Sequence, residues 1–220
     1  NPNGGDNTCF VDLFRSMRHI SLPISGADME DPVITTPSGY EYRPTGGPWT
    51  FYSGAGLTKN NTAFTRANPP APQGQQVMFL QNNARGTINL QIDMAASYRI
   101  RFQAALRGNN NPATEEQSVL LTVDGTVLGS FDIEDFNYVE YISMPIYLTP
   151  GNYTMEVKGL APIGSDNTAF LDDMQLEMVS DWQDAYAWDG GVPTSNDNAT
   201  IPAGATMAMR GTMNAHNVTV

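Results

Sequence analysis

The fold class follows from one stretch of this 220-residue chain, Ser97-Tyr98-Arg99-Ile100-Arg101-Phe102-Gln103-Ala104-Ala105-Leu106. Apolar side chains recur at every second position from Tyr98 to Leu106. The polar residues Arg99, Arg101 and Gln103 occupy positions between them. A period of two is typical of a strand in an antiparallel sheet with one buried and one solvated face. The polar side chains therefore belong to an exposed sheet face.

Similar short apolar runs recur between Pro23 and Val179, separated by clusters of Gly, Pro, Asn and Asp. The dipeptide Asp124-Gly125 separates two of these runs and predicts a two-residue β-hairpin. No long helical pattern occurs. We therefore expect residues 23–179 to form an all-β domain, an antiparallel sandwich or barrel.

The flanking segments differ from this domain in composition. Residues 1–22 open with a polar, Gly- and Asn-rich stretch, and we expect a linker or N-terminal extension with a little apolar docking. Residues 180–220 contain two short strand-like pieces, 198–201 and 215–220, around Gly204 and Gly211. This pattern predicts the start of a second β domain, because about forty residues cannot easily close a core of their own.

Charge and composition narrow the range of partners. The chain has 11 Lys and Arg against 23 Asp and Glu, a formal charge of −12. Such a surface excludes nucleic acids and anionic membranes as expected partners and suits cation binding. Cys9 is the single cysteine, and His19 and His216 are the two histidines, which argues against disulfides, zinc sites and His-based catalytic triads. No apolar run is long enough for membrane insertion.

Two segments carry a family resemblance. Gly26-Ala27-Asp28-Met29-Glu30-Asp31-Pro32 resembles the first strand of jelly-roll modules with a galactose-binding-like fold, and Phe170-Leu171-Asp172-Asp173-Met174-Gln175-Leu176 resembles their last strand. Residues 42–51 and 68–74 are similar to bacterial secreted modules of this type. The resemblance implies a jelly-roll β-sandwich, an extracellular or cell-surface location and a polysaccharide or other glycan as the partner.

The tail resembles a second family. Its residues match the opening of the eight-glycine domain, which leads into right-handed β-helices of extracellular proteins; they are Trp182, Trp188, Gly190, Gly191, Pro193, Asp197, Ile201 and Gly204. The resemblance implies that the chain is the front of a longer secreted protein. The alternative is a short C-terminal β-extension packed on the sandwich.

Carboxylates near both ends of the sandwich suggest a structural Ca²⁺ site. The first and last strands of such a jelly roll are neighbours, which would bring Asp28 and Glu30 towards Asp172 and Asp173. Calcium takes 6–8 oxygen ligands from carboxylates and carbonyls. Because adjacent strand residues point to opposite faces, only one of the two aspartates is expected to face inward, together with Phe170 and Met174. Solvated edge carboxylates are the alternative.

Aromatic and polar side chains supply the candidate glycan contacts, because sugar rings stack on flat aromatic faces. The candidates are Tyr40, Tyr42, Tyr52, Tyr138 and Tyr141, together with the stripe Arg99, Arg101 and Gln103 and its extension Arg107. Trp49 and Phe51 are expected in the core. The arginines could also bind a uronate carboxylate. Alternatively, the stripe is a solvated face with salt bridges to Glu156 or Asp124.

We expect a non-catalytic, calcium-stabilised carbohydrate-binding module within a larger secreted or surface protein. The spacing of the acidic residues selects no pair for glycoside hydrolysis; the nominal candidates are Asp28, Glu30, Asp132, Glu134, Asp135 and Glu140. Two alternatives remain. The first is a structural or adhesive module that self-associates through residues 1–22 or 180–220. The second is a piece of a catalytic chain whose active site lies beyond Val220.

Overall fold

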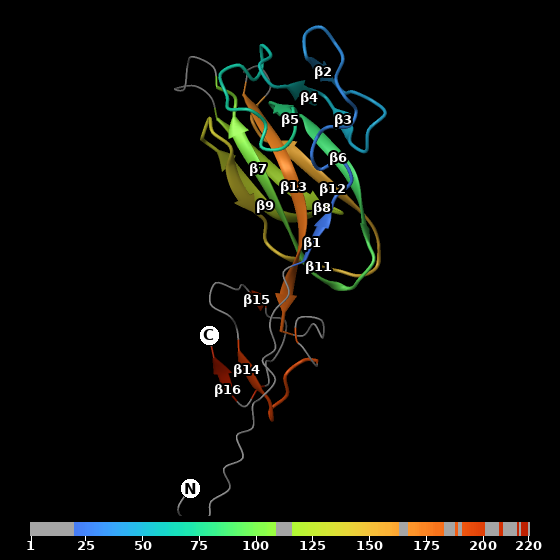
Figure 1. Ribbon diagram of the computed structural model, residues 1–220, viewed down its shortest axis with the longest axis vertical. Coiled ribbons are helices and arrows are strands. Elements are labelled where there is room, and N and C mark those ends of the chain that lie inside the picture. The colour runs from blue at the N-terminus through green and yellow to red at the C-terminus, as the bar shows by residue number, and fades with distance from the viewer. Residues whose placement is uncertain are drawn as a thin grey trace, which may run out of the picture. The chain divides into compact units, whose positions relative to one another are not determined.

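The computed structural model describes residues 20–108, 116–162, 167–182, 188, 191–200, 207–208, 215 and 217–219. Every regular element among them is a β-strand, and two antiparallel sheets pack as a sandwich (Figure 1). The predicted all-β jelly-roll sandwich is therefore confirmed. None of the described residues belongs to a helix that could cross a lipid bilayer. The predicted N-terminal extension lies outside the described residues as far as residue 19.

The larger of the two sheets is the one that carries the Arg99–Gln103 stripe. Its strands run in the order β10 (Val139–Ile142), β7 (Ala96–Leu106), β13 (Thr168–Asp181), β5 (Gln76–Gln81), β4 (Ala55–Lys59) and β2 (Tyr40–Tyr42). Two further strands of the sandwich pair with it, β1 (Ile20–Pro23) with β13 and β11 (Ile146–Leu148) with β7, and a third strand pairs with the end of β13 in the second unit described below. We call this the large sheet.

The second sheet has five strands. They run in the order β3 (Thr50–Tyr52), β6 (Arg85–Ile92), β12 (Gly151–Gly159), β8 (Gln117–Val123) and β9 (Thr126–Ile133). The predicted hairpin joins β8 to β9. Asp124 and Gly125 both have positive φ, 46° and 77°, as a two-residue turn of type I′ requires.

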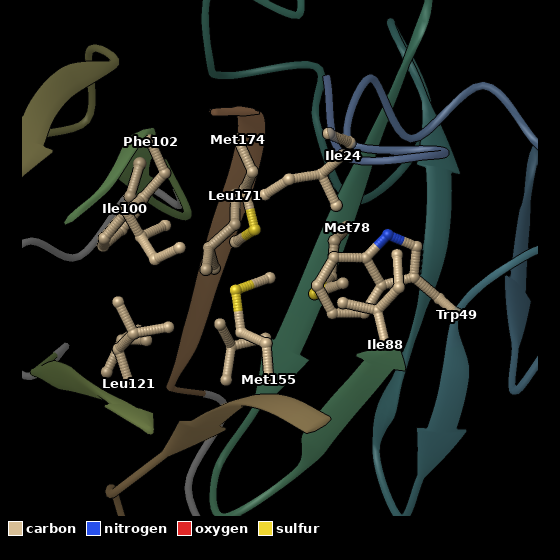
Figure 2. Packing of buried hydrophobic residues seen from close by; sticks show 14 of the residues in the cluster. Ile24, Trp49, Met78, Ile88, Ile100, Phe102, Leu121, Met155, Leu171 and Met174 are labelled. Atoms are coloured by element: carbon tan, nitrogen blue, oxygen red, sulfur yellow. The ribbon is translucent and has the colours of Figure 1, made fainter. Parts of the chain in front are cut away.

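The core lies between the two sheets (Figure 2). Tyr98, Ile100 and Phe102 of β7 are at most 1% exposed, as their alternation with polar residues predicts. Side chains of both sheets meet there, Met78, Leu171 and Met174 from the large sheet and Ile88, Leu121 and Met155 from the five-stranded sheet. The predicted core residues Trp49 and Phe51 are also buried, and the Trp49 indole donates to the carbonyl of Gly26.

The described residues after Met178 belong to a second unit, which we describe by itself. Two of its strands, β14 (Asn198–Thr200) and β16 (Asn217–Thr219), pair in parallel at the two predicted strand-like pieces. A short strand, β15 (Met207–Ala208), pairs in parallel with the end of β13. Trp182, Trp188 and Ala199 form a small core. The resemblance to the eight-glycine domain stays a prediction.

A buried glutamine ties together the chain at one end of the sandwich. Gln117 is 2% exposed. Its Nε2 donates to the carbonyls of Leu80, Asn82 and Asn167, and its Oε1 accepts from the N–H groups of Leu160 and Ala161. One side chain therefore satisfies backbone groups from three separate segments.

Replacing this carboxamide should weaken the whole sandwich. Gln117→Leu keeps the side-chain volume but leaves buried backbone groups without partners, each at a cost of ~1–3 kcal/mol. We expect the free energy of unfolding to fall by about 2–5 kcal/mol in urea denaturation. Gln91→Leu, on an exposed position of β6, is the matched control and should change it by less than about 0.5 kcal/mol. Equal effects of the two variants would contradict the proposed role of Gln117.

Candidate functional site

The outer face of the large sheet depends on a shift in the alternation of β13. Ala169 and Leu171 point into the core, but so do Met174 and Leu176, so the alternation moves by one residue between them. Asp173 lies at this point with φ of 49°, a left-handed conformation that Asp tolerates better than most residues. This is the geometry of a β-bulge, which redirects side chains. Asp172 and Asp173 therefore both lie off the core face.

This shift corrects the expectation that one aspartate faces inward with both Phe170 and Met174. Phe170 lies in a separate cluster with Phe79 and Val77, whereas Met174 lies in the core between the sheets. Asp172 is fully buried, but not in that core. Strict alternation would have placed Phe170 and Met174 on the same face, so the bulge explains the difference.

A long loop, residues 60–75, covers part of this outer face, and we call it the covering loop. Phe64 packs on Phe79, with ring centres 4.9 Å apart, and the Arg107 guanidinium lies 4.5 Å from the Phe64 ring centre. Asn68 fixes the loop, because its Nδ2 donates to the carbonyls of Leu106 and Phe136, both at 2.8 Å. The loop, which includes the proline-rich residues 68–72, is therefore held against the outer face of the sheet.

Asp172 is the most unusual titratable group of the described residues. Its Oδ2 accepts from the backbone N–H of Gln73 at 2.8 Å, and its Oδ1 has no hydrogen-bond partner within the part of the chain that the structure describes. Burial raises the pKa of Asp172 to about 7. The backbone N–H groups of Gln73 and Asp173 lower this pKa, and the charges of Asp173 and Glu30 raise it. A buried carboxylate oxygen without a donor is costly unless a cation compensates it.

Glu30 lies close to this carboxylate and binds the same segment of the covering loop. Its Oε1 accepts from the N–H groups of Gln75 and Gln76 at 2.6 and 2.7 Å. Gly74 has φ of 64°, and a Cβ there would lie 2.3 Å from the Glu30 Oε1. Residues 73–76 therefore connect Glu30 to Asp172.

The four predicted metal ligands separate into two pairs. Glu30 and Asp172 meet at residues 73–76, whereas Asp28 and Asp173 line a neighbouring pocket. No group of three or more acidic, His or Cys side chains suited to a metal occurs among the described residues. A calcium ion would therefore need backbone or side-chain carbonyl oxygens besides Glu30 and Asp172. The unpartnered Oδ1 of Asp172 fits such an ion.

The pocket at the bulge has a volume of about 360 Å³. Its polar lining consists of Asp28, Gln73, Asp173 and Gln175, and its apolar lining of Leu22, Ile24, Ala27 and Met174. Gln175 donates to the Asp173 Oδ1 at 2.8 Å, and Gln103 donates to the Oδ2 at 3.4 Å. Gln103, one of the predicted glycan contacts, therefore binds a residue that lines this pocket, Asp173. Gln73 and Gln175 were not identified from the sequence.

The arginine stripe is paired with acidic residues, but not with the predicted ones. Arg99 Nε and Arg101 Nε donate to the two oxygens of Glu177, at 2.8 and 3.0 Å, and Arg101 also donates to Glu140 at 2.8 Å. Glu177 is 3% exposed, so it is a buried counter-charge. The predicted partners Glu156 and Asp124 are wrong, because Glu156 lies in the five-stranded sheet and pairs with Arg85, and Asp124 lies in the turn between β8 and β9.

The predicted tyrosines do not form one platform. Tyr40 and Tyr42 belong to the edge strand β2, and their rings lie near that of Phe64 in the covering loop. The Tyr42 side chain is 40% exposed. Tyr52 lies in the five-stranded sheet under the Arg85 guanidinium. Tyr138 packs against the cluster beneath the covering loop, where burial raises its pKa, and Tyr141 stacks on the core ring of Phe102. The sequence identified these tyrosines as candidates, but it did not indicate that they lie on different parts of the sandwich.

A larger pocket of about 480 Å³ lies elsewhere, at the ends of β7, β8 and β9. Its lining includes the carboxylates of Glu116, Asp132 and Glu134. The Ser118 hydroxyl donates to Asp132 at 2.6 Å. This pocket holds none of the predicted glycan contacts and two of the nominal hydrolase carboxylates, Asp132 and Glu134. The smaller pocket contains the predicted metal ligands Asp28 and Asp173 and lies beside Gln103, so we assign the candidate site to it and to the arginine stripe.

Comparison with known proteins supports the fold. No protein-family model matches the chain, and no curated protein matches it. Among solved structures, a cyclase from Fischerella sp. TAU is 18% identical with a TM-score of 0.53, over 73% of this chain and 97% of that one. A Stig cyclase from the same organism, in complex with (3Z)-3-(1-methyl-2-pyrrolidinylidene)-3H-indole, is 18% identical with a TM-score of 0.51, over 73% and 98%. A family 35 carbohydrate binding module from Clostridium thermocellum is 21% identical with a TM-score of 0.40, over 58% and 90%.

The raised pKa of Asp172 predicts how the metal-free protein responds to pH. Folding raises this pKa from 3.8 to about 7, so the folded state holds the proton more tightly than the unfolded chain. The metal-free sandwich should therefore lose stability, on the order of 4 kcal/mol, as pH rises from about 4 to 7. Asp172→Asn should remove most of this dependence, measured by urea denaturation in EDTA. Asp93→Asn, at an exposed position, is the control, and an unchanged pH profile in Asp172→Asn would contradict the assignment.

Proposed function

We propose that the sandwich is a non-catalytic glycan-binding module of an extracellular protein, stabilised by calcium. The observation that carries the proposal is the pocket at the bulge together with the polar outer face of the large sheet beside it. There, a pocket of about 360 Å³ adjoins a row of fixed carboxylate, carboxamide and guanidinium groups. Sugar hydroxyls both donate and accept hydrogen bonds, so a surface with both kinds of partner suits them.

The polar groups of this face are held in place before any ligand binds. Asp173 is fixed by Gln175 and Gln103, and Arg101 is fixed by Glu177 and Glu140. Fixed side chains lose little conformational entropy on binding, which favours recognition of a flexible, solvated ligand. None of these contacts supplies a nucleophile paired with a base. The face is therefore suited to binding.

Calcium is proposed at Glu30 and Asp172. When bound, the ion would neutralise two neighbouring carboxylates and compensate the unpartnered Oδ1 of Asp172. Residues 73–76 already bind both carboxylates, so the cation would hold this part of the covering loop. A site with two carboxylates fits the weak affinities, about 10⁻⁴–10⁻³ M, of extracellular calcium modules.

The fold alone does not decide between binding and catalysis. The similar solved structures include two cyclases, at identities that concern the fold only. The proposal of a non-catalytic module rests on the described site. The alternative is a structural or adhesive module that self-associates through its terminal segments, most of which lie outside the described residues.

Calcium should raise the melting temperature of the wild-type sandwich, because binding to the folded state alone stabilises it. We expect a rise of several degrees between EDTA and 5–10 mM CaCl₂, a stabilisation of ~1–3 kcal/mol. Asp172→Asn should show little of this rise, whereas Asp132→Asn, in the larger pocket, should keep it. A wild-type melting temperature that is the same in EDTA and in calcium would contradict the calcium proposal.

Binding of a polysaccharide should be detectable on an array of plant, bacterial and algal glycans. We expect the purified protein with calcium to retain at least one of them, and the binding to be reduced in Asp173→Asn/Gln175→Ala. Absence of binding to every glycan, together with self-association in analytical ultracentrifugation, would favour the structural module instead.

A further inference from the structure

We infer that the pocket at the bulge binds one uncharged hexose unit and rejects acidic sugars, an inference that rests on the proposed glycan-binding function. The pocket lies between the segment Leu22–Asp28, the loop residue Gln73 and the bulge of β13. Its volume, about 360 Å³, is near the lower end of small-molecule sites. It therefore suits a single ring rather than a long chain buried along its length.

The lining of the pocket matches the two kinds of surface on a hexose. Leu22, which is only partly buried, provides an apolar surface for the C–H groups of a ring, and the core side chains of Ile24 and Met174 also line the pocket. Asp28 and Asp173 are acceptors, and the carboxamides of Gln73 and Gln175 supply donors and further acceptors. Hydroxyl groups that donate to carboxylates and accept from carboxamides are the complementary ligand chemistry.

The carboxylate of Asp173 is aimed and fixed by its surroundings. The residue adopts φ of 49°, and its two oxygens already accept from Gln175 and Gln103. A carboxylate offers about four lone-pair positions, so two such bonds leave room for ligand hydroxyls. The Asp173 side chain is 20% exposed, enough to meet a ligand without being freely mobile.

Charge determines which sugars fit. The proposed calcium ion would be balanced by Glu30 and Asp172, so Asp28 and Asp173 still place two negative charges on the pocket. The nearest arginine, Arg101, lies 3.9 Å from Asp173 and is already paired with Glu140 and Glu177. A uronate or sulfate would meet two carboxylates, and neighbouring like charges repel by an amount that grows as solvent is excluded. We therefore replace the suggestion that the arginines bind a uronate with the inference that the pocket prefers uncharged sugars to acidic ones.

Matched oligosaccharides test the inference. The full chain, with calcium present, is titrated by isothermal calorimetry with gluco-, manno- and galacto-oligosaccharides and with their C6-oxidised uronate counterparts. We expect a neutral series to bind and its oxidised counterpart to bind at least about tenfold more weakly. Tighter binding of the oxidised form would overturn the inference while leaving the proposed glycan binding intact.

Two variants locate the binding. Asp173→Asn retains a residue that tolerates positive φ and removes the charge, and should weaken neutral binding by about tenfold. The double variant Asp28→Asn/Asp173→Asn should also narrow the difference between neutral and oxidised sugars, an effect that a merely structural role would not produce. Glu134→Gln, in the larger pocket, is the matched control and should change neither quantity. If Glu134→Gln loses binding while Asp173→Asn binds as well as the wild type, the sugar belongs in the larger pocket and the inference is overturned.

If no oligosaccharide binds, the proposed glycan-binding function fails, and the selectivity that rests on it fails with it. Circular dichroism and the calcium-induced rise in melting temperature then show whether the protein was folded. A folded, calcium-responsive protein that binds none of the neutral or oxidised probes would overturn both the inference and the glycan-binding proposal.

Discussion

The one-residue shift at Asp172 and Asp173 determines both faces of the large sheet. A strand places alternate residues on opposite faces, and a slip of one position exchanges them all. Without the shift, Met174 and Leu176 would leave the core that they now help to fill, and Gln175 and Glu177 would enter it. The core around β1 and β13 and the polar outer face are therefore two results of one left-handed residue.

The polar outer face then depends on a buried counter-charge. Glu177 is almost inaccessible and lies between two guanidinium groups, an arrangement in which each charge requires the others. Removing one partner of such a group generally destabilises more than the pair contributes, because the remaining charge stays buried. The network therefore holds the side chains of β7, β10 and β13 in one arrangement. The network also neutralises the positive charge of the arginines, so this face attracts anionic ligands less strongly.

Much of the fold could be predicted from the sequence, and less of the site. The alternation in β7, the Asp124-Gly125 turn and the core positions of Trp49 and Phe51 are local signals, and the structure has all of them. The bulge is not a local signal, because the Asp-Asp pair fits either an alternating or a shifted strand. The salt-bridge partners of the arginines follow from strand order, which a single sequence does not give. Gln73 and Gln175 belong to the pocket only because the chain brings distant segments together.

The covering loop explains why the outer face has two parts of different character. Over one part, Phe64 and its neighbours exclude water, and Asp172 is buried beneath the loop with an unpartnered oxygen. Over the other part, Arg99 and Arg101 are paired with Glu177 and Glu140. Gln73 joins the two parts, because its backbone N–H binds Asp172 while the residue also lines the pocket. Gly74 keeps this junction close to Glu30, since any side chain there would collide with the carboxylate. The geometry of the pocket is therefore set partly by how the charges of the buried Asp172 and the neighbouring Glu30 are compensated.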